Sequence, residues 1–127
     1  MAKIAIIDDD PDIVEATSLL LESKGHVIVT AGNLEEGMNL IDSEKPELIL
    51  LDVMMDEPDD GFYMAHKLRK LGIRTPIILL TSVSNAIGYN YGVGETLPID
   101  DFLEKPVLPS VLMEKVKFYT EKKGGKK

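Results

Sequence analysis

The amino-acid sequence predicts one α/β domain, in which a doubly wound, five-stranded parallel sheet carries helices on both of its faces. Short apolar segments alternate along the chain with longer segments whose apolar residues recur at helical spacing, and this alternation is typical of a parallel sheet. Candidate strands near the middle of the chain are apolar at consecutive positions, as expected for strands covered on both sides. The length of 127 residues suits a single domain.

The chain opens with a predicted strand and helix. Lys3–Ile7 is apolar and β-branched, which favours a buried strand. Pro11 suits the first position of a helix, because its missing N–H would have no partner there in any case. From Ile13 to Leu21 the apolar residues follow helical spacing, and Gly25 supplies a stop signal.

A second helix lies between two further predicted strands. Asn33 with Glu36 three residues later resembles a capping box and marks the start of this helix. Pro46 ends the helical pattern. The flanking strands are predicted over His26–Thr30 and Leu48–Leu51.

The next helix is predicted over Phe62–Leu71, between Gly61 and Gly72, with apolar residues at helical spacing on one side. The apolar segment Pro76–Leu80 follows as the fourth strand, and Asp101–Leu103 is a short fifth one.

The remaining helices differ in the strength of their signals. The pattern places a helix within Val83–Ile99, but three glycines and a proline favour a short or distorted one. Pro109 and Ser110 precede a last helix with apolar residues at helical spacing. We expect the domain to cover residues 1–121, followed by a polar tail over residues 122–127.

The composition excludes several classes of function. The chain holds 14 Lys and Arg against 22 Asp and Glu, a net charge of −8, so nucleic-acid binding through its body is disfavoured. Cysteine is absent, which excludes disulfides, thiolate metal sites and cysteine nucleophiles. No apolar segment has the length of a signal peptide or of a membrane span, and we expect a cytoplasmic protein without membrane contact.

Chemically active side chains stand where the predicted strands end. They are Asp8 and Asp9, Asp52, Thr81, and Lys105. Because the carboxyl ends of parallel strands share one rim of the sheet, we expect these groups to meet there. Three adjacent carboxylates repel one another and raise each other's pKa, and a hard divalent cation such as Mg²⁺ removes that conflict. A carboxylate is also a nucleophile in phosphoryl transfer, and lysine offers a point charge for phosphate.

Five motifs in order carry a resemblance that covers nearly the whole chain. They are Ile7-Asp8-Asp9, Leu50-Leu51-Asp52-Val53-Met54-Met55, Asp60-Gly61, Leu80-Thr81-Ser82 and Phe102-Leu103-Glu104-Lys105-Pro106. The sequence resembles the receiver domains of response regulators in two-component signalling, of the chemotaxis-type single-domain kind. The resemblance implies a flavodoxin-like strand order, 2-1-3-4-5.

The resemblance also implies a role for each site residue. Asp52 would be the phosphoacceptor. Asp8, Asp9, Asp52 and the backbone carbonyl of Met54 would hold Mg²⁺, with Asp8 acting largely through water. Thr81 and Lys105 would contact the phosphoryl group, and Thr81 would form a switch with Phe102, which replaces the commoner tyrosine. The loop from residue 53 to residue 60 holds one residue more than the family pattern.

The function that this resemblance implies is that of a stand-alone receiver without an output domain. A histidine kinase or a histidine phosphotransfer protein would supply the phosphoryl group, and a downstream protein would be the target of a monomer or weak homodimer. The domain would take part in its own phosphorylation and slow autodephosphorylation without being an enzyme for other substrates.

Two alternatives remain open. One is a docking module that keeps the fold but is not phosphorylated. The other is a phosphatase with an aspartyl nucleophile, against which the side chain at Met54 counts, because such enzymes carry a second Asp at that position. Considered alone, the acidic triplet Asp8–Asp10 would be only a helix N-terminus favoured by the helix dipole.

Overall fold

The computed structural model describes residues 2–53, 60–81, 99–105 and 107–125. Five parallel strands form one sheet with the order β2-β1-β3-β4-β5, which confirms the predicted fold class and strand order. In chain order the elements are β1 (Lys3–Ile7), α1 (Pro11–Glu22), β2 (Val27–Ala31), α2 (Leu34–Glu44), β3 (Leu48–Asp52), α3 (Asp60–Lys70), β4 (Ile77–Thr81), β5 (Asp101–Glu104) and α5 (Pro109–Gly125).

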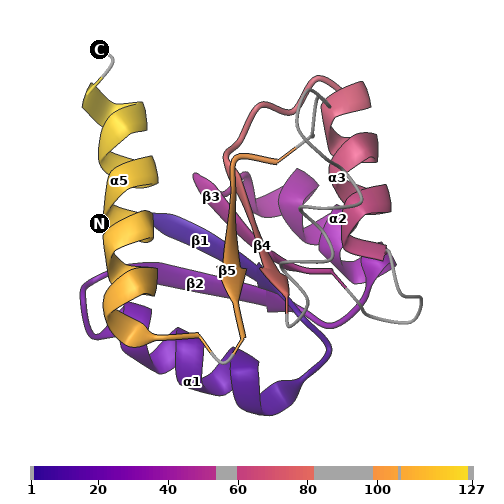
Figure 1. Ribbon diagram of the computed structural model, residues 1–127. Helices are drawn as coiled ribbons and strands as arrows, with labels where there is room; N and C mark the ends of the chain where they lie inside the picture. Colours follow the sequence, from indigo (N-terminus) through magenta and orange to yellow (C-terminus); the bar gives the residue numbers. More distant parts are fainter. Residues whose placement is uncertain (1, 54–59, 82–98, 106, 126–127) are drawn as a thin grey trace.

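The helices cover the two faces of the sheet as predicted (Figure 1). Side chains of α2 and α3 pack on one face, around Ile7, Leu51 and Leu79. Side chains of α1 and α5 pack on the other face, around Ile6, Leu50 and others. All five residues of β3 and all five of β4 are buried, because these strands lie inside the sheet and both of their faces are covered.

The helix starts follow from local hydrogen bonds. Asp10 caps α1 by accepting a hydrogen bond from the N–H of Asp12 at 3.0 Å, and Pro11 occupies the first turn. Asn33 caps α2 by accepting from the N–H of Glu36 at 2.9 Å. The Glu36 carboxylate accepts from the N–H of Gly32 rather than from that of Asn33, so the return bond of the predicted box lies one residue earlier.

The boundaries differ from the predictions by small shifts. Strand β2 begins and ends one residue later than predicted, because the N–H of His26 bonds back to the carbonyl of Leu21 in α1 and the pairing toward β1 begins at Val27, whose N–H bonds to the carbonyl of Ala2. Helix α3 begins at Asp60, before Gly61. Helix α5 continues to Gly125, within the segment expected to be a tail. Of the helix predicted within Val83–Ile99, residues 83–98 lie outside the described residues.

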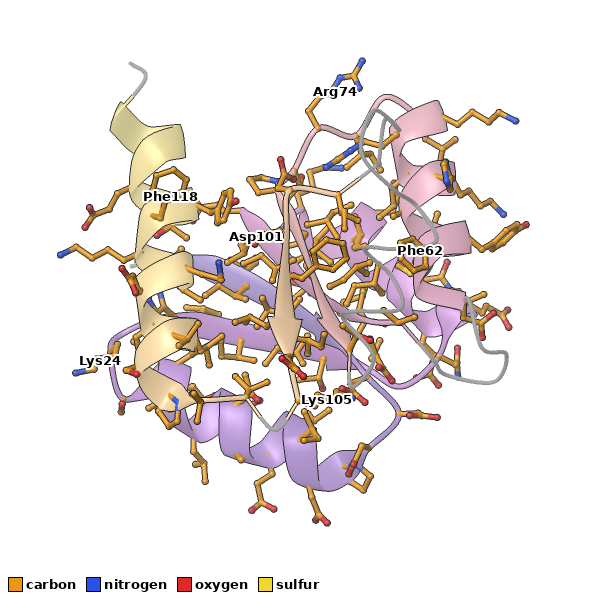
Figure 2. The ribbon with its side chains drawn as sticks, in the orientation of Figure 1. Lys24, Phe62, Arg74, Asp101, Lys105 and Phe118 are labelled. Atoms are coloured by element: carbon orange, nitrogen blue, oxygen red, sulfur yellow. The ribbon has the colours of Figure 1, made fainter. Side chains whose placement is uncertain are left out.

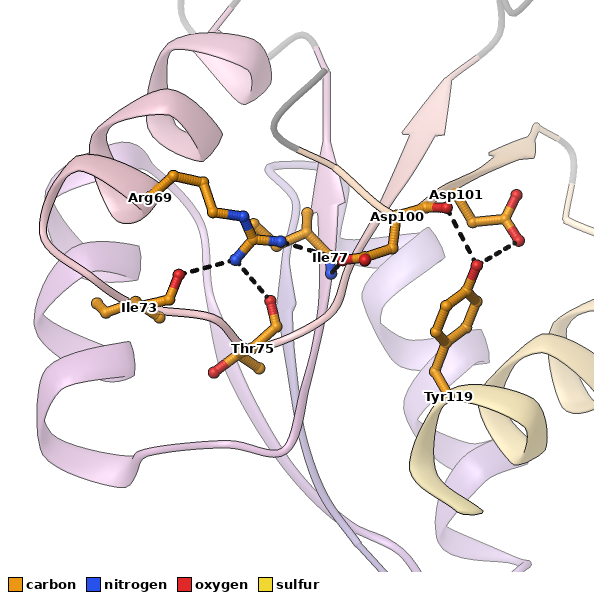
Figure 3. A network of polar contacts seen from close by, with 7 residues as sticks. All are labelled: Arg69, Ile73, Thr75, Ile77, Asp100, Asp101 and Tyr119. Carbon is orange, nitrogen blue, oxygen red and sulfur yellow. Dashed lines mark hydrogen bonds and ion pairs between the residues drawn. The ribbon is translucent and has the colours of Figure 1, made fainter. Parts of the chain in front are cut away.

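A polar network fastens the rim of the sheet at which β4 and β5 begin (Figure 3). The Arg69 guanidinium donates to the carbonyls of Ile73 and Thr75, both at 2.8 Å, and lies 3.0 Å from Asp100 Oδ2. The same Asp100 oxygen accepts the N–H of Ile77 at 2.8 Å. The Tyr119 hydroxyl donates to the Asp100 carbonyl at 3.0 Å. The end of α3, the starts of β4 and β5, and helix α5 are therefore joined at one place.

We expect Arg69→Ala to lower the free energy of unfolding by about 2 kcal/mol, because it leaves two carbonyls and one carboxylate without their charged donor. Arg69→Lys should recover less than half of this loss, since an ammonium lacks the planar fork that reaches all three acceptors. Urea unfolding measures both values. His66→Ala, at an exposed position of the same helix, is the control. A loss for Arg69→Ala no larger than for this control would contradict the role of the network.

Among the described residues, no helix combines the length and the apolar character needed to cross a membrane.

Candidate functional site

Three carboxylates meet at the rim where the strands end. Asp8 and Asp9 follow β1, and Asp52 is the last residue of the neighbouring β3. Each of the three offers one carboxylate oxygen, and these oxygens all lie within 4.8 Å of one another. Asp8 is 2% exposed and Asp52 is 5% exposed, whereas Asp9 is open to solvent. The predicted meeting of these side chains is thus found in the structure.

The backbone holds Asp8 in place. Its N–H donates to the carbonyl of Ala31 at 3.1 Å, which continues the pairing of β1 with β2. Its Oδ1 accepts the N–H of Asp10 at 2.9 Å. Its Oδ2 accepts no well-directed hydrogen bond from the described residues, although it is fully buried. That oxygen is therefore available to a cation.

Lys105, the residue that follows β5, supplies such a cation. Its ammonium lies 3.0 Å from Asp8 Oδ2 and 3.2 Å from Asp52 Oδ1, and so bridges the two buried carboxylates. The backbone N–H of Lys105 donates to the carbonyl of Thr81 at 2.7 Å, which fixes the chain where the side chain sets out. Figure 2 shows Lys105 just beyond the arrowhead of β5, whereas Arg74 lies at the other end of the sheet.

The carboxylates and the ammonium change each other's protonation. The pKa of Asp52 is raised to about 6, chiefly by burial and next by the neighbouring charge of Asp8, while Lys105 acts in the opposite direction. Burial lowers the pKa of Lys105, but the contacts with Asp8 and Asp52 outweigh burial and raise it above its usual value. Without a further cation, Asp52 thus carries its charge less readily than an ordinary aspartate.

The donor set fits Mg²⁺, which prefers hard oxygen ligands and is held by a few carboxylates together with water. Asp8 Oδ2 is buried beside only the ammonium that it shares with Asp52, and the three carboxylates exceed the single positive charge of Lys105. A divalent cation would correct both deficits. Met54, whose carbonyl was predicted as a further ligand, lies outside the described residues.

Thr81 lies on β4, the strand next to that of Asp52, and Phe102 lies on β5, one strand further along the sheet. Thr81 ends β4 and is 2% exposed, and its register partner on β5 is Glu104. Phe102 is partly buried and packs against the core beneath α2 and α3. The described part of the chain thus brings Thr81 to the rim beside Asp52, and it places Phe102 two residues before Glu104 within the same strand.

Comparison with known proteins agrees with this geometry. The sequence profile of the response regulator receiver domain matches residues 4–117. The chain belongs to the response regulator receiver domain family.

Curated relatives of this receiver domain include two transcriptional regulators. The alkaline phosphatase synthesis transcriptional regulatory protein PhoP of Bacillus subtilis is 34% identical over 115 residues, which is 91% of this chain and 47% of that protein. The transcriptional regulatory protein AfsQ1 of Streptomyces coelicolor is 36% identical over 117 residues, which is 92% of this chain and 50% of that protein. The chain spans about half the length of these relatives.

Solved structures resemble this receiver domain over its whole length. A two-component response regulator from Clostridium difficile has a TM-score of 0.79 at 33% identity, covering 95% of this chain and 97% of that one. A CheY-like response regulator receiver domain protein from Methanospirillum hungatei has a TM-score of 0.82 at 28% identity, covering 100% of this chain and 99% of that one.

Gly61 has a role in this receiver domain that the sequence indicated only through its place in a motif. A Cβ at Gly61 would collide with the carbonyl oxygen of Asp52 and would lie 2.7 Å from Cα of Val53. The Gly61 N–H donates to the Val53 carbonyl at 2.8 Å. Helix α3 therefore rests directly on the backbone that carries Asp52. In the sequence, only the Asp60-Gly61 motif pointed to this position, where only a residue without a side chain fits.

The ion pair between Lys105 and Asp8 was not predicted. The sequence placed Asp8 and Lys105 at the same rim but assigned Lys105 only to a phosphoryl group, because nothing in the local sequence pairs the residue after β1 with the residue after β5. The ion pair between Lys105 and Asp8 depends on the folded sheet, in which β1, β3, β4 and β5 lie side by side.

Proposed function

We propose that this receiver domain accepts a phosphoryl group on Asp52 from the phosphohistidine of a histidine kinase or of a histidine phosphotransfer protein, in a reaction that depends on Mg²⁺. The observation that carries the proposal is the rim cluster, in which three carboxylate oxygens lie within 4.8 Å and the Lys105 ammonium stands 3.2 Å from Asp52 Oδ1. The family supports the same role. Asp52 as the acceptor, and Mg²⁺ as the cofactor, are expectations that the experiment below tests.

Asp52 is favoured over its two neighbours as the nucleophile by its position. It lies on β3, between β1 with Asp8 and Asp9 on one side and β4 with Thr81 on the other. Both oxygens of Asp8 already have partners, Oδ1 in the N–H of Asp10 and Oδ2 in the Lys105 ammonium. Asp9 is exposed to solvent, unlike the buried Asp52.

The transfer itself needs an ionised Asp52. One of its oxygens donates an electron pair to phosphorus, the new O–P bond forms, and the P–N bond to the donor imidazole breaks, with its electrons returning to the ring nitrogen. Lys105 begins from a position beside this carboxylate, so that its ammonium balances the charge of the incoming phosphoryl oxygens. The Thr81 hydroxyl would bind a second phosphoryl oxygen.

Mg²⁺ would be held by Asp8, Asp9 and Asp52, and when bound it neutralises charge on the phosphoryl oxygens. The protein residues prepare this site by keeping Asp8 buried and Asp9 accessible from solvent. A bound cation would lower the pKa of Asp52 from its raised value of about 6 and so increase the ionised, nucleophilic fraction.

Phosphorylation would be read out by a protein partner through β5 and its neighbours. Strand β5 joins Lys105 at the rim to Phe102 in the core and to Asp101, whose carboxylate lies 2.8 Å from Lys115 of α5. A shift of Lys105 toward the phosphoryl group would therefore reach both the core and the surface of α5. We propose a downstream protein in the cytoplasm as the target.

The test is phosphorylation with a small acyl phosphate in Mg²⁺, followed by intact-mass and peptide mass analysis. We expect the mass of one phosphoryl group on Asp52, none in Asp52→Asn, and none in excess chelator. Asp9→Asn should reduce the phosphorylation rate by about a hundredfold or more, because it removes an expected metal ligand. The matched control is Asp10→Asn, since Asp10 belongs to the same acidic triplet but caps α1 instead.

Several outcomes would contradict the proposal. A phosphoryl group found on another residue would show that Asp52 is not the phosphoacceptor. Full modification in excess chelator would show that the reaction does not depend on Mg²⁺. If the wild type were modified neither by acyl phosphate nor by a phosphorylated donor protein, the result would favour a docking module that has the receiver fold but is not phosphorylated.

A further inference from the structure

Residues of helices α2 and α3 line a groove. These two helices cover the face of the sheet opposite to α1 and α5 (Figure 1). The volume of the groove is about 310 Å³, and its floor is mostly apolar. The residues that line it include Leu34, Glu35, Met38, Tyr63, Met64 and Lys67. Tyr63 is 59% exposed although it is a large aromatic residue. An exposed aromatic side chain beside a methionine-lined groove is typical of a protein contact surface.

The two sides of this groove carry opposite charges. Along α2, Glu35, Asn39 and Asp42 follow one another at steps of four and three residues, so they form one stripe. Helix α2 contains four acidic residues and no basic one. The α2 stripe is therefore acidic at both ends.

Along α3, Tyr63, Lys67 and Lys70 have the same steps of four and three residues and form the facing stripe. The Lys67 ammonium lies 5.9 Å from the centre of the Tyr63 ring, which keeps it over the groove. Lys67 and Lys70 are exposed. The α3 stripe is thus basic in a chain whose net charge is −8.

The lining residues also set the register of the two stripes. Glu35 and Asn39 share the groove with Tyr63 and Lys67. Both helices return from the same rim of the parallel sheet and so run in the same direction, and Asp42 and Lys70 each extend their stripe by one further step that way. Each step of one stripe therefore has a counterpart in the other.

We propose that this groove binds the same groove of a second copy of the chain, around a two-fold axis that runs along it. Such an axis places α2 of each copy opposite α3 of the other, so that Asp42 of each chain faces Lys70 of the other and Glu35 approaches Tyr63 and Lys67. Both halves of the contact then pair acid with base, and each Tyr63 covers the apolar floor of the opposite groove.

Charge complementarity favours a second copy over a partner of a single sign. An acidic peptide would be attracted by the α3 stripe but repelled by Glu35 and Asp42, and a basic peptide would meet the reverse conflict. A partner must offer base opposite α2 and acid opposite α3 at the same spacing, which the two-fold related groove does. The dimer should be weak, because the two copies, each with a charge of −8, repel one another at longer range.

Sedimentation equilibrium over a range of protein concentrations tests the proposal. We expect a concentration-dependent dimer for the wild type. In Lys67→Glu with Lys70→Glu, and separately in Glu35→Lys with Asp42→Lys, the dimer dissociation constant should rise by about tenfold or more. An equimolar mixture of the two variants should form a heterodimer, because all the paired charges are then opposite again. The control is Lys24→Glu with Lys117→Glu, two exposed lysines on the side of α1 and α5, which should dimerise as the wild type does.

The mixture separates this proposal from an effect of misfolding, since two unfolded variants cannot rescue each other. Tyr63→Ser, which changes no charge, gives a second measurement and should weaken the dimer as well. A wild type that stays monomeric at every concentration would overturn the proposal, as would a mixture that does not associate. Binding of an acidic peptide such as polyglutamate by a monomeric wild type would assign the groove to a partner of another kind.

Discussion

Gly61→Ala is expected to lower the free energy of unfolding by about 3 kcal/mol or more, which is among the larger effects of a single substitution. The added Cβ would collide with the carbonyl oxygen of Asp52, and it would lie 2.7 Å from Cα of Val53. These atoms belong to the backbone of Asp52, the last residue of β3, and of Val53, which follows it. A backbone cannot move aside as a flexible side chain can. Chemical unfolding followed by circular dichroism measures the loss.

Gly32→Ala is the matched control for this substitution. A Cβ at Gly32 meets nothing closer than an oxygen of Glu36 at 4.0 Å, and this glycine does not need a positive φ. Its stability should change by no more than about 0.5 kcal/mol, as at other open surface positions. If the two variants were equally stable, α3 would not be pressed against the backbone of Asp52.

Asp52→Asn is expected to raise the free energy of unfolding at neutral pH by about 2 to 3 kcal/mol in protein without divalent cations. The pKa of Asp52 is raised from 3.8 to about 6 in the folded protein, so the folded state holds this proton more tightly than the unfolded state does. Ionisation therefore destabilises the folded protein, and an amide of the same shape avoids that penalty.

The sign of this effect gives its pH dependence. The penalty is complete above about pH 6, decreases as the pH falls from about 6 to about 3.8, and is absent below that. Urea unfolding of both proteins from about pH 7.5 to about pH 4 should thus show two curves that converge in acid. Asp10→Asn makes the same chemical change at an exposed helix cap and should have little effect at any pH. A wild type as stable as Asp52→Asn at neutral pH would contradict the raised pKa.

The positions of the site residues could be predicted because they depend on strand ends. In a parallel sheet every strand points the same way, so residues such as Asp8 and Asp52, each at the end of an apolar segment, must reach the same rim. Their hydrophobic strands are easy to recognise, and the order of those strands came from the resemblance to a family. Helix starts at Pro11 and Asn33 were likewise predictable, since capping depends on residues only a few positions apart.

Contacts between distant residues could not be predicted. Nothing in the local sequence indicates that Arg69 bonds to Asp100, 31 residues later, or that the Asp100 carboxylate also accepts the N–H of Ile77. The effect of neighbouring carboxylates on the pKa was predicted, but burial, the largest cause of the raised pKa of Asp52, exists only in the folded chain. The space at Gly61 is of the same kind, because it is set by how closely α3 approaches β3.

The ammonium of Lys105 between Asp8 and Asp52 makes the domain carry its own counter-ion. A divalent cation arriving at this cluster would compete with a tethered monovalent one, and its affinity would measure only the advantage of the second charge over the first. Such a competition would moderate the affinity, because Lys105 already compensates part of the carboxylate charge. It would also link cation binding to geometry: if the lysine were drawn toward another anion, the carboxylates would lose their internal competitor and become better ligands.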